Sequence, residues 1–452
     1  MSMKKLFNNI SYLYKMQDDT YMKDAYILVE DNVISEIGQG EYKGSSDKVI
    51  NCKDHLILPG FINVHHHFYQ TLFRNVKQVQ SATLFDWLKY LYEKWKHIDE
   101  EAVYISTKIA LLEMIKSGVT TSSDHLYLFP NGNNKLFDME IKAAKEIGVR
   151  FYPTRGSMSL SKKDGGLPPD SVVQSDTEIM QESERVINQY HDPSLHSMLR
   201  IGLAPCSPFS VTDEIMRQTA EFSRKHDILI HTHLAETRDE EDFCLQKVGL
   251  RPVDYLDELG WLNKRSWLVH LVWLNENDRK KLHKNNCGMA HCPSSNMRLG
   301  SGIAPVTLLK DKIRIGLGVD GSASNDTNNM LSEIRRAMLL QRVKYGADAI
   351  SPYQALRFAT VGGAKVLNIN DYAGVLSPGM SADFIGFDLN RLEFAGGLSD
   401  PLGALVLCDA KQVDLSVING EIKVQNGELI IQNLPELIEK QNRKAANLLA
   451  KK

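Results

Sequence analysis

Short apolar strands that end in a histidine or an aspartate recur through the middle of this chain, and they limit the folds it can adopt. Amphipathic stretches with helical periodicity, such as 212–225 and 330–345, lie between these strands. The clearest apolar runs are 228–230, 267–269 and 313–317. Alternating strand and helix units favour parallel strands covered by helices. We therefore predict an α/β protein built on a TIM-like (β/α)8 barrel.

The two ends of the chain carry a different pattern of short strands and turns. Strand-like runs occupy 25–29, 33–34 and 55–58, and the pattern returns at 382–387 and 415–427. We predict that the two ends pair into one small β-sandwich beside the barrel. The expected organisation is sandwich at 1–58, barrel at 59–371, sandwich again at 372–432 and a C-terminal helix at 433–452.

Composition excludes several classes of protein. A length of 452 residues suits a large barrel with an accessory unit. A net charge of -3 without a basic patch argues against nucleic acid as a partner. No apolar run is long enough for a bilayer, and the segment 1–16 lacks the apolar core of a signal peptide, so we expect a cytoplasmic protein. The six cysteines form no Cys-x-x-Cys pair, which argues against a zinc finger or a disulfide framework.

Two histidine pairs stand at expected strand ends. Side chains alternate along a strand, so His65 and His67 should face the same way about 6.6 Å apart, a good chelating pair. His66 should point oppositely and be structural. His231 and His233 also share a face, and His233 lies nearer the carboxyl end, where barrel enzymes place their sites. We expect His231 to be a hydrogen-bonded core residue one layer deeper.

Further candidates follow the later strands. Glu236 follows His233 at the expected rim, where a glutamate is usually solvated but could here exchange a proton with a substrate. Asp320 ends so apolar a strand that its burial would be costly without a cation or hydrogen bonds, which favours a metal. For His270, a core role and an active-site role are equally open. His291 is a weaker candidate for the site.

Two other motifs can be set aside. The string at 316–321 matches G-x-G-x-x-G, but Asp320 within it would repel a pyrophosphate, so we reject a dinucleotide site. The other zinc deaminase design carries H-x-E and P-C-x-x-C, and neither string occurs in the chain.

The ordered motifs resemble the amidohydrolase superfamily. They are Pro59-Gly60, His65-x-His67, His233-x-x-Glu236, His270 and Asp320. The branch that the chain resembles contains cytosine and guanine deaminases, adenosylhomocysteine deaminase and triazine hydrolases. The likeness covers nearly the whole chain, including the motif at 376–383. Longer strings are similar to 8-oxoguanine deaminases, at 65–71, 122–130, 155–159, 165–170 and 318–326.

The resemblance implies one divalent metal ion. Two-metal members carry a carboxylated lysine after a middle strand, and the corresponding stretch 199–207 has no lysine. The implied ligands are His65, His67, His233 and Asp320. Zinc suits three imidazoles and a carboxylate, and iron would also fit.

The implied reaction is hydrolytic deamination. Asp320 and His270 are expected to take the proton of the attacking water, and Glu236 to protonate a ring nitrogen. The expected substrate is 8-oxoguanine, giving urate and ammonia. Isoxanthopterin or another pterin, guanine and aminotriazines remain alternatives. A non-catalytic scaffold is the rival from another class, and the filled ligand positions argue against it.

Substrate contacts are less constrained by the sequence. Gln70, Arg155 and Cys206 are candidates, with a structural role equally open for Arg155 and Cys206. Apolar residues at 84, 87, 88, 91 and 95 have helical spacing, which favours core over a substrate lid. We expect a small heterocyclic substrate and a homo-oligomer, with neither nucleic acid nor membrane as partner.

Overall fold

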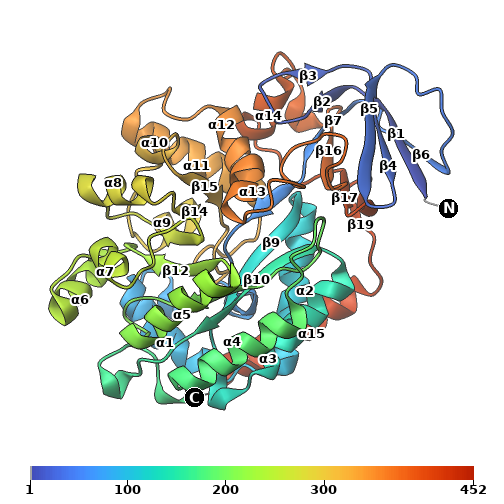
Figure 1. Cartoon of the computed structure of the whole chain (residues 1–452). Coiled ribbons are helices and arrows are strands. Elements are labelled where there is room, and N and C mark those ends of the chain that lie inside the picture. The colour runs from blue at the N-terminus through green and yellow to red at the C-terminus, as the bar shows by residue number, and fades with distance from the viewer. Residues whose placement is uncertain (1–2, 452) are drawn as a thin grey trace.

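The computed structural model describes residues 3–451 and contains a closed barrel of eight parallel strands (Figure 1). The strands follow chain order, and the last pairs with the first through Leu317 opposite Asn63. They are β8 (Phe61–Asn63), β9 (Val119–Leu126), β10 (Arg150–Ser157), β11 (Gly202–Pro205), β12 (Ile230–Leu234), β13 (Ser266–His270), β14 (Gly288–His291) and β15 (Arg314–Leu317). The predicted barrel is confirmed.

Helices connect these strands and also follow the last of them. The main ones are α1 (Leu84–Trp95), α2 (Glu100–Lys116), α3 (Lys135–Ile147), α4 (Asp176–Tyr190), α5 (Asp213–His226), α6 (Arg238–Val248), α7 (Pro252–Glu258), α8 (Glu276–Lys284), α9 (Pro293–Arg298), α10 (Val306–Leu309), α11 (Met330–Tyr345), α12 (Pro352–Arg357) and α13 (Gly363–Val366). Their boundaries have local causes. The Thr212 side chain accepts from the backbone N–H of Ile215 and caps α5, which ends at the left-handed Asp227 (φ 52°).

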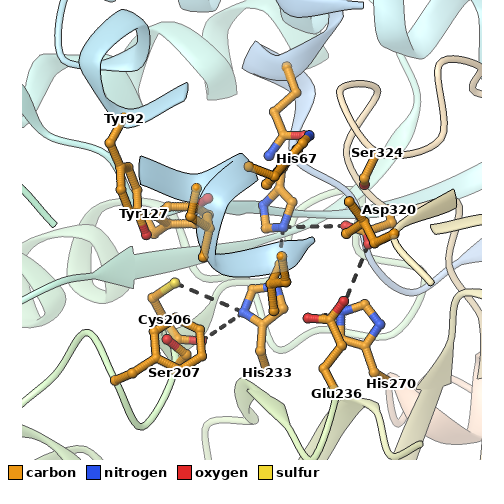
Figure 2. Close-up of a pocket in the computed structure, with 16 residues that line it drawn as sticks. His67, Tyr92, Tyr127, Cys206, Ser207, His233, Glu236, His270, Asp320 and Ser324 are labelled. Atoms are coloured by element: carbon orange, nitrogen blue, oxygen red, sulfur yellow. Dashed lines mark hydrogen bonds and ion pairs between the residues drawn. The ribbon is translucent and has the colours of Figure 1, made fainter. Parts of the chain in front are cut away.

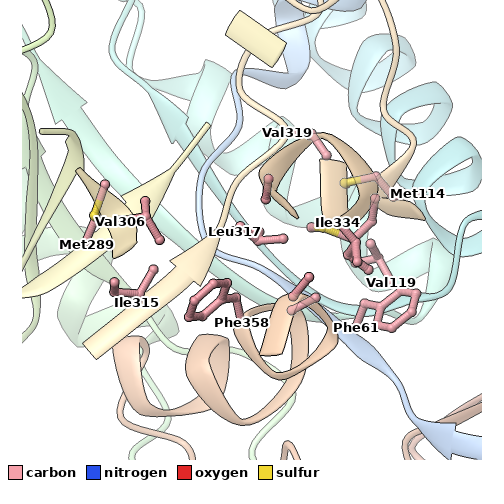
Figure 3. Close-up of a cluster of buried hydrophobic side chains, with 14 of the residues drawn as sticks. Phe61, Met114, Val119, Met289, Val306, Ile315, Leu317, Val319, Ile334 and Phe358 are labelled. Carbon is pink, nitrogen blue, oxygen red and sulfur yellow. The ribbon is translucent and has the colours of Figure 1, made fainter. Parts of the chain in front are cut away.

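A continuous apolar layer joins the strands to the helices. In β15, Ile315 and Leu317 pack with Ile334 and Phe358 of the surrounding helical segments (Figure 3). Between them stands Gly316, where a Cβ would lie 2.9 Å from Cγ1 of Val64. The glycine therefore allows a close approach between neighbouring segments of the barrel.

The chain ends form two sheets beside the barrel, as predicted. One has the order β5-β4-β1-β6, with bounds Val33–Gln39, Ala25–Glu30, Lys4–Ile10 and Lys48–Asn51. The other has the order β19-β18-β17-β16-β7-β2-β3, with bounds Glu428–Leu429, Glu421–Gln425, Leu415–Ile418, Phe384–Asp388, His55–Pro59, Tyr12–Tyr14 and Tyr21–Met22. Phe7 of one sheet meets Phe384 of the other edge to face, with ring centroids 4.8 Å apart. The domain boundaries expected from the sequence stay predictions.

Two helices follow the barrel. Helix α14 (Pro401–Leu407) comes between strands β16 and β17 in the sequence and packs against α11 and α12. Helix α15 (Leu434–Ala450) runs along α2 away from the sandwich (Figure 1). Gln441 and Leu448 are the buried residues of α15, and Gln441 Nε2 donates to Thr71 Oγ1 at 3.0 Å. None of the helices within 3–451 has both the length and the apolar character that a bilayer crossing requires.

Candidate active site

Histidines gather at the carboxyl ends of the barrel strands. Strand β8 ends at Asn63, so His65 and His67 lie in the loop beyond it and strand alternation does not set their spacing, which differs from the prediction. Backbone bonds hold the loop instead, because His65 O accepts from Asp320 N at 3.2 Å. The two rings still meet edge to face, with centroids 4.7 Å apart.

The ring nitrogens of these histidines converge on the Asp320 carboxylate, and Figure 2 shows the contact that His67 makes. His65 Nε2 lies 3.2 Å and His67 Nε2 3.5 Å from Asp320 Oδ1. His67 Nε2 and His233 Nε2 are 3.2 Å apart. The structure thus brings together all four residues that the resemblance implied as metal ligands.

Backbone carbonyls set the tautomer of two of these rings. His67 Nδ1 donates to His125 O and His233 Nδ1 donates to Cys206 O, each at 2.7 Å. A carbonyl can only accept, so the hydrogen of each neutral ring sits on Nδ1 and Nε2 carries a lone pair.

The third ring is oriented through a relay. His231 Nδ1 donates to Trp267 O at 2.8 Å, so its Nε2 accepts from His65 Nδ1, also at 2.8 Å. His65 Nε2 is then left as a buried nitrogen with no hydrogen-bond partner. His231 is a hydrogen-bonded interior residue, as the sequence suggested.

This arrangement suits a cation. Burial lowers the pKa of His67 to about 3 and that of His233 to about 4, so both rings are neutral near pH 7. Burial alone would raise the pKa of Asp320, but its contact with His65 and its closeness to His270 and His67 hold that pKa well below its usual range. Imidazole lone pairs facing an ionised carboxylate in a buried site repel one another unless a cation lies between them.

His125 joins this cluster although sequence reasoning gave it no role. One of its ring nitrogens lies within 4.8 Å of those of His65, His67 and His233. Its Nε2 bonds Ala204 O at 2.9 Å, and its Nδ1 is buried without a partner. The sequence signal that could have identified His125 is a histidine near the end of an expected barrel strand.

A second group faces the carboxylate from the other side. His270 Nε2 lies 3.4 Å from Glu236 Oε2 and 3.9 Å from Asp320 Oδ2. Ser301 Oγ donates to Glu236 Oε1 at 3.2 Å, and Asn296 Oδ1 contacts His270 Nδ1 at 2.9 Å. Glu236 is buried rather than solvated at a rim, and burial followed by the charge of Asp320 raises its pKa to about 8.

Unusual backbone conformations accompany these residues. His270 and Asp320 have φ of 72° and 61°, in the left-handed region that side chains other than glycine rarely adopt. Such strained conformations persist only where the surrounding structure enforces them. Here they accompany two side chains, His270 and Asp320, that face each other beside the pocket.

Glycine in the rejected dinucleotide motif has a steric purpose. A Cβ at Gly318 would lie 2.7 Å from Cβ of His65 and 3.0 Å from Sγ of Cys292. A Cβ at Gly321 would lie 1.9 Å from Oε1 of Gln70. These glycines leave room for His65 and Gln70, so the motif needs no phosphate to explain it.

A pocket adjoins the cluster. Its lining combines polar groups near the strand ends with apolar and aromatic side chains: His67, Gln70, Leu84, Trp87, Leu88, Tyr92, Tyr127, Cys206, Ser207, Phe209, His233, Glu236, His270, Leu299, Asp320 and Ser324. Two of the predicted substrate contacts, Gln70 and Cys206, are among them. The mixed polar and apolar lining suits a small planar ligand.

Arg155 is not among the residues that line this pocket. Its guanidinium donates to Gly156 O, to Asn134 Oδ1 at 3.0 Å and to Gln174 Oε1 at 2.6 Å. It also lies over the ring of Phe129, 4.0 Å from the centroid. These contacts favour the structural alternative for Arg155.

Helix α1 forms one wall of the pocket. Leu84, Trp87 and Leu88 line the pocket and are also buried in the adjoining apolar cluster with Leu91 and Trp95. The helical spacing correctly indicated a packed face, and part of that face covers the site.

The chain matches the Amidohydrolase family over residues 56–423. The protein belongs to this family. Among amidohydrolases, it is 47% identical over 427 residues to 8-oxoguanine deaminase from Pseudomonas aeruginosa, covering 94% of this chain and 95% of that protein. It is 35% identical over 398 residues to hydroxydechloroatrazine ethylaminohydrolase from Pseudomonas sp. (strain ADP), covering 86% and 82%.

Solved amidohydrolase-like structures share the whole architecture. Atrazine chlorohydrolase from Arthrobacter aurescens TC1, complexed with zinc, superposes with a TM-score of 0.93 at 28% identity, covering 98% of this chain and 100% of that chain. An adenosine deaminase from Xanthomonas campestris with bound zinc gives 0.89 at 25% identity, covering 99% of each chain.

Proposed function

We propose that this protein is a metal-dependent aminohydrolase that deaminates 8-oxoguanine to urate and ammonia. The observation that carries the proposal is the convergence of three neutral imidazoles on Asp320, with His65 Nε2 buried and unpartnered. His65, His67, His233 and Asp320 would hold one divalent ion, which we propose to be zinc, with iron as the alternative. When bound there, such an ion supplies Lewis acidity and makes water nucleophilic near neutral pH.

The chain's own groups would handle the protons. His270 and Asp320 face each other beside the pocket, so either can accept the proton of the attacking water. Glu236 lines the pocket and is oriented by Ser301 rather than by the proposed metal ligands. This position suits proton delivery to a ring nitrogen. Proton return to the amino group then allows ammonia to leave.

The relatives and the pocket support an oxidised purine as substrate. The 47% identity to an 8-oxoguanine deaminase extends over nearly the whole chain. The pocket offers the Gln70 amide among apolar and aromatic walls, so a flat amide-bearing ring can be both stacked and hydrogen bonded. An aminotriazine is the second candidate, supported by the 35% identity to a triazine-type aminohydrolase.

Steady-state kinetics on the purified protein would test the substrate. We expect kcat/KM to be highest for 8-oxoguanine, with guanine lower by about 10⁴-fold because sites built on hydrogen bonds reject analogues that lack the partner. Isoxanthopterin and an aminotriazine complete the panel. If another amine is preferred, the substrate is wrong and the deaminase assignment stands; if no ring releases ammonia, both are wrong.

Elemental analysis would test the metal. We expect one equivalent of divalent metal per chain, because the pocket lining contains no lysine that could bridge a second ion. Two equivalents, both required for turnover, would contradict this. The homo-oligomer and the cytoplasmic location expected from the sequence stay predictions.

A further inference from the structure

Helix α1 carries a buried hydroxyl, that of Tyr92, which the proposed chemistry does not use. Tyr92 is 1% exposed, and its hydroxyl has no hydrogen-bond partner. Among the described pocket-lining residues, it is the one with a buried side-chain oxygen or nitrogen left unpaired. A buried hydroxyl without a partner is unfavourable, and because Tyr92 lines the pocket, a bound ligand can supply the missing partner.

The two serine hydroxyls of the pocket are already engaged. Ser207 Oγ bonds Ser210 Oγ at 2.7 Å, and Ser324 Oγ bonds Gly321 O at 3.1 Å. Gln70 is partly engaged, since its Oε1 accepts from Ala323 N at 3.3 Å. Of the buried side-chain oxygens and nitrogens that belong to described pocket-lining residues, the Tyr92 hydroxyl is therefore the one left without a partner.

Tyr92 lies away from the reacting groups. In Figure 2, Tyr92 and Tyr127 stand on one side of His67, and Asp320 and Glu236 stand on the other. Burial holds the pKa of Tyr92 well above its usual value, so the hydroxyl stays protonated and can donate.

We propose that the Tyr92 hydroxyl donates a hydrogen bond to the C8 carbonyl of the bound purine and is a specificity-determining residue. The proposal rests on the proposed function. The amino-bearing C2 and the C8 of a purine lie at opposite ends of the ring system. When C2 faces Glu236 and Asp320, C8 is directed toward the far side of the pocket, where Tyr92 lies. Guanine has only C–H at that position and leaves the hydroxyl unpaired.

Tyr92→Phe tests this by removing one oxygen. We expect kcat/KM for 8-oxoguanine to fall at least about tenfold, and that for guanine to change less than about threefold. Because the hydroxyl has no protein partner, the metal-loaded variant should keep the melting temperature of the parent protein. Tyr90→Phe on the same helix is the matched control, since Tyr90 does not line the pocket.

Dissociation constants of ligands that do not react give a readout that needs no turnover by the variant. Urate carries the C8 carbonyl and xanthine lacks it, so Tyr92→Phe should weaken binding of urate and leave binding of xanthine unchanged, each measured by calorimetry. Equal losses for both ligands, no loss for either, or a lowered melting temperature would overturn the proposal. If the parent protein deaminates 8-oxoguanine and Tyr92→Phe keeps its preference, only this inference fails; if the parent deaminates no purine, the proposed function fails.

Discussion

At the scale of the residue, the position of each imidazole proton decides what the cluster can bind. His67 and His233 give their Nδ1 hydrogens to backbone carbonyls, and His65 gives its hydrogen to His231. Each Nε2 is therefore a lone-pair donor before any ion arrives. Orienting groups of this kind increase metal affinity because the ligands need no rearrangement.

Replacing His231 with phenylalanine tests the relay. The ring would still stack on Trp267, whose centroid lies 4.3 Å away, but His65 Nδ1 would lose its acceptor. We expect metal affinity to fall about tenfold to a hundredfold, measured by competition with a chelator. Unchanged affinity would mean that another group orients His65.

Glu236→Gln separates proton transfer from metal binding. Glu236 lies outside the clusters of potential ligand atoms, so the variant should keep its metal content. We expect kcat to fall about a hundredfold or more, because an amide cannot serve as the acid or base. A variant active within a few-fold of the parent would remove Glu236 from the reaction.

At the scale of the element, α15 supports the wall of the pocket. Leu448 is buried in the same apolar cluster as Leu88 and Trp95 of α1. Gln441 reaches Thr71 in the 3-10 helix η1 (Phe68–Phe73), which also carries Gln70. The last helix of the chain therefore contributes to the site without lining it.

Leu448→Ala should show this support. Deleting buried methyl groups removes burial and leaves a cavity, so we expect the free energy of unfolding to fall by about 2 kcal/mol or more. The measurement is urea unfolding of the holoenzyme. Ile438→Ala on the same helix is the control, because Ile438 is 45% exposed. Equal effects of the two variants would show that α15 is only loosely attached.

At the scale of the whole molecule, a buried ion pair joins the barrel to the sandwich. Arg150 at the start of β10 donates through Nε to Asp383 Oδ2 at 2.8 Å, and both side chains are at most 5% exposed. Asp383 Oδ1 also accepts from Asn419 N at 2.6 Å. This junction lies at the amino end of a barrel strand, opposite the end that carries the site.

Asp383→Ala would leave the Arg150 guanidinium buried and without its carboxylate. We expect the free energy of unfolding to fall by about 3 kcal/mol or more, while protein that remains folded keeps its metal. Glu276→Gln removes an exposed pair with Lys280 and should leave the free energy of unfolding nearly unchanged. Loss of metal from folded Asp383→Ala would show that the sandwich acts on the site.

The sequence by itself determined the barrel and the main residues of the site, because both follow from patterns among neighbours along the chain. Alternating strands and helices imply the barrel, because the pattern of apolar residues is a property of neighbours along the chain. The sequence also predicted the cluster of His65, His67, His233 and Asp320, because each of them follows an expected strand and parallel strands share a carboxyl edge.

Only the tertiary structure decided which polar atoms are free. Burial of Glu236, the relay from His231 to His65 and the unpartnered hydroxyl of Tyr92 depend on partners far apart in the sequence. For the same reason, Arg155 is engaged by Asn134 and Gln174 rather than by the pocket. Desolvation and hydrogen-bond satisfaction are set by three-dimensional surroundings, and sequence spacing carries no record of them.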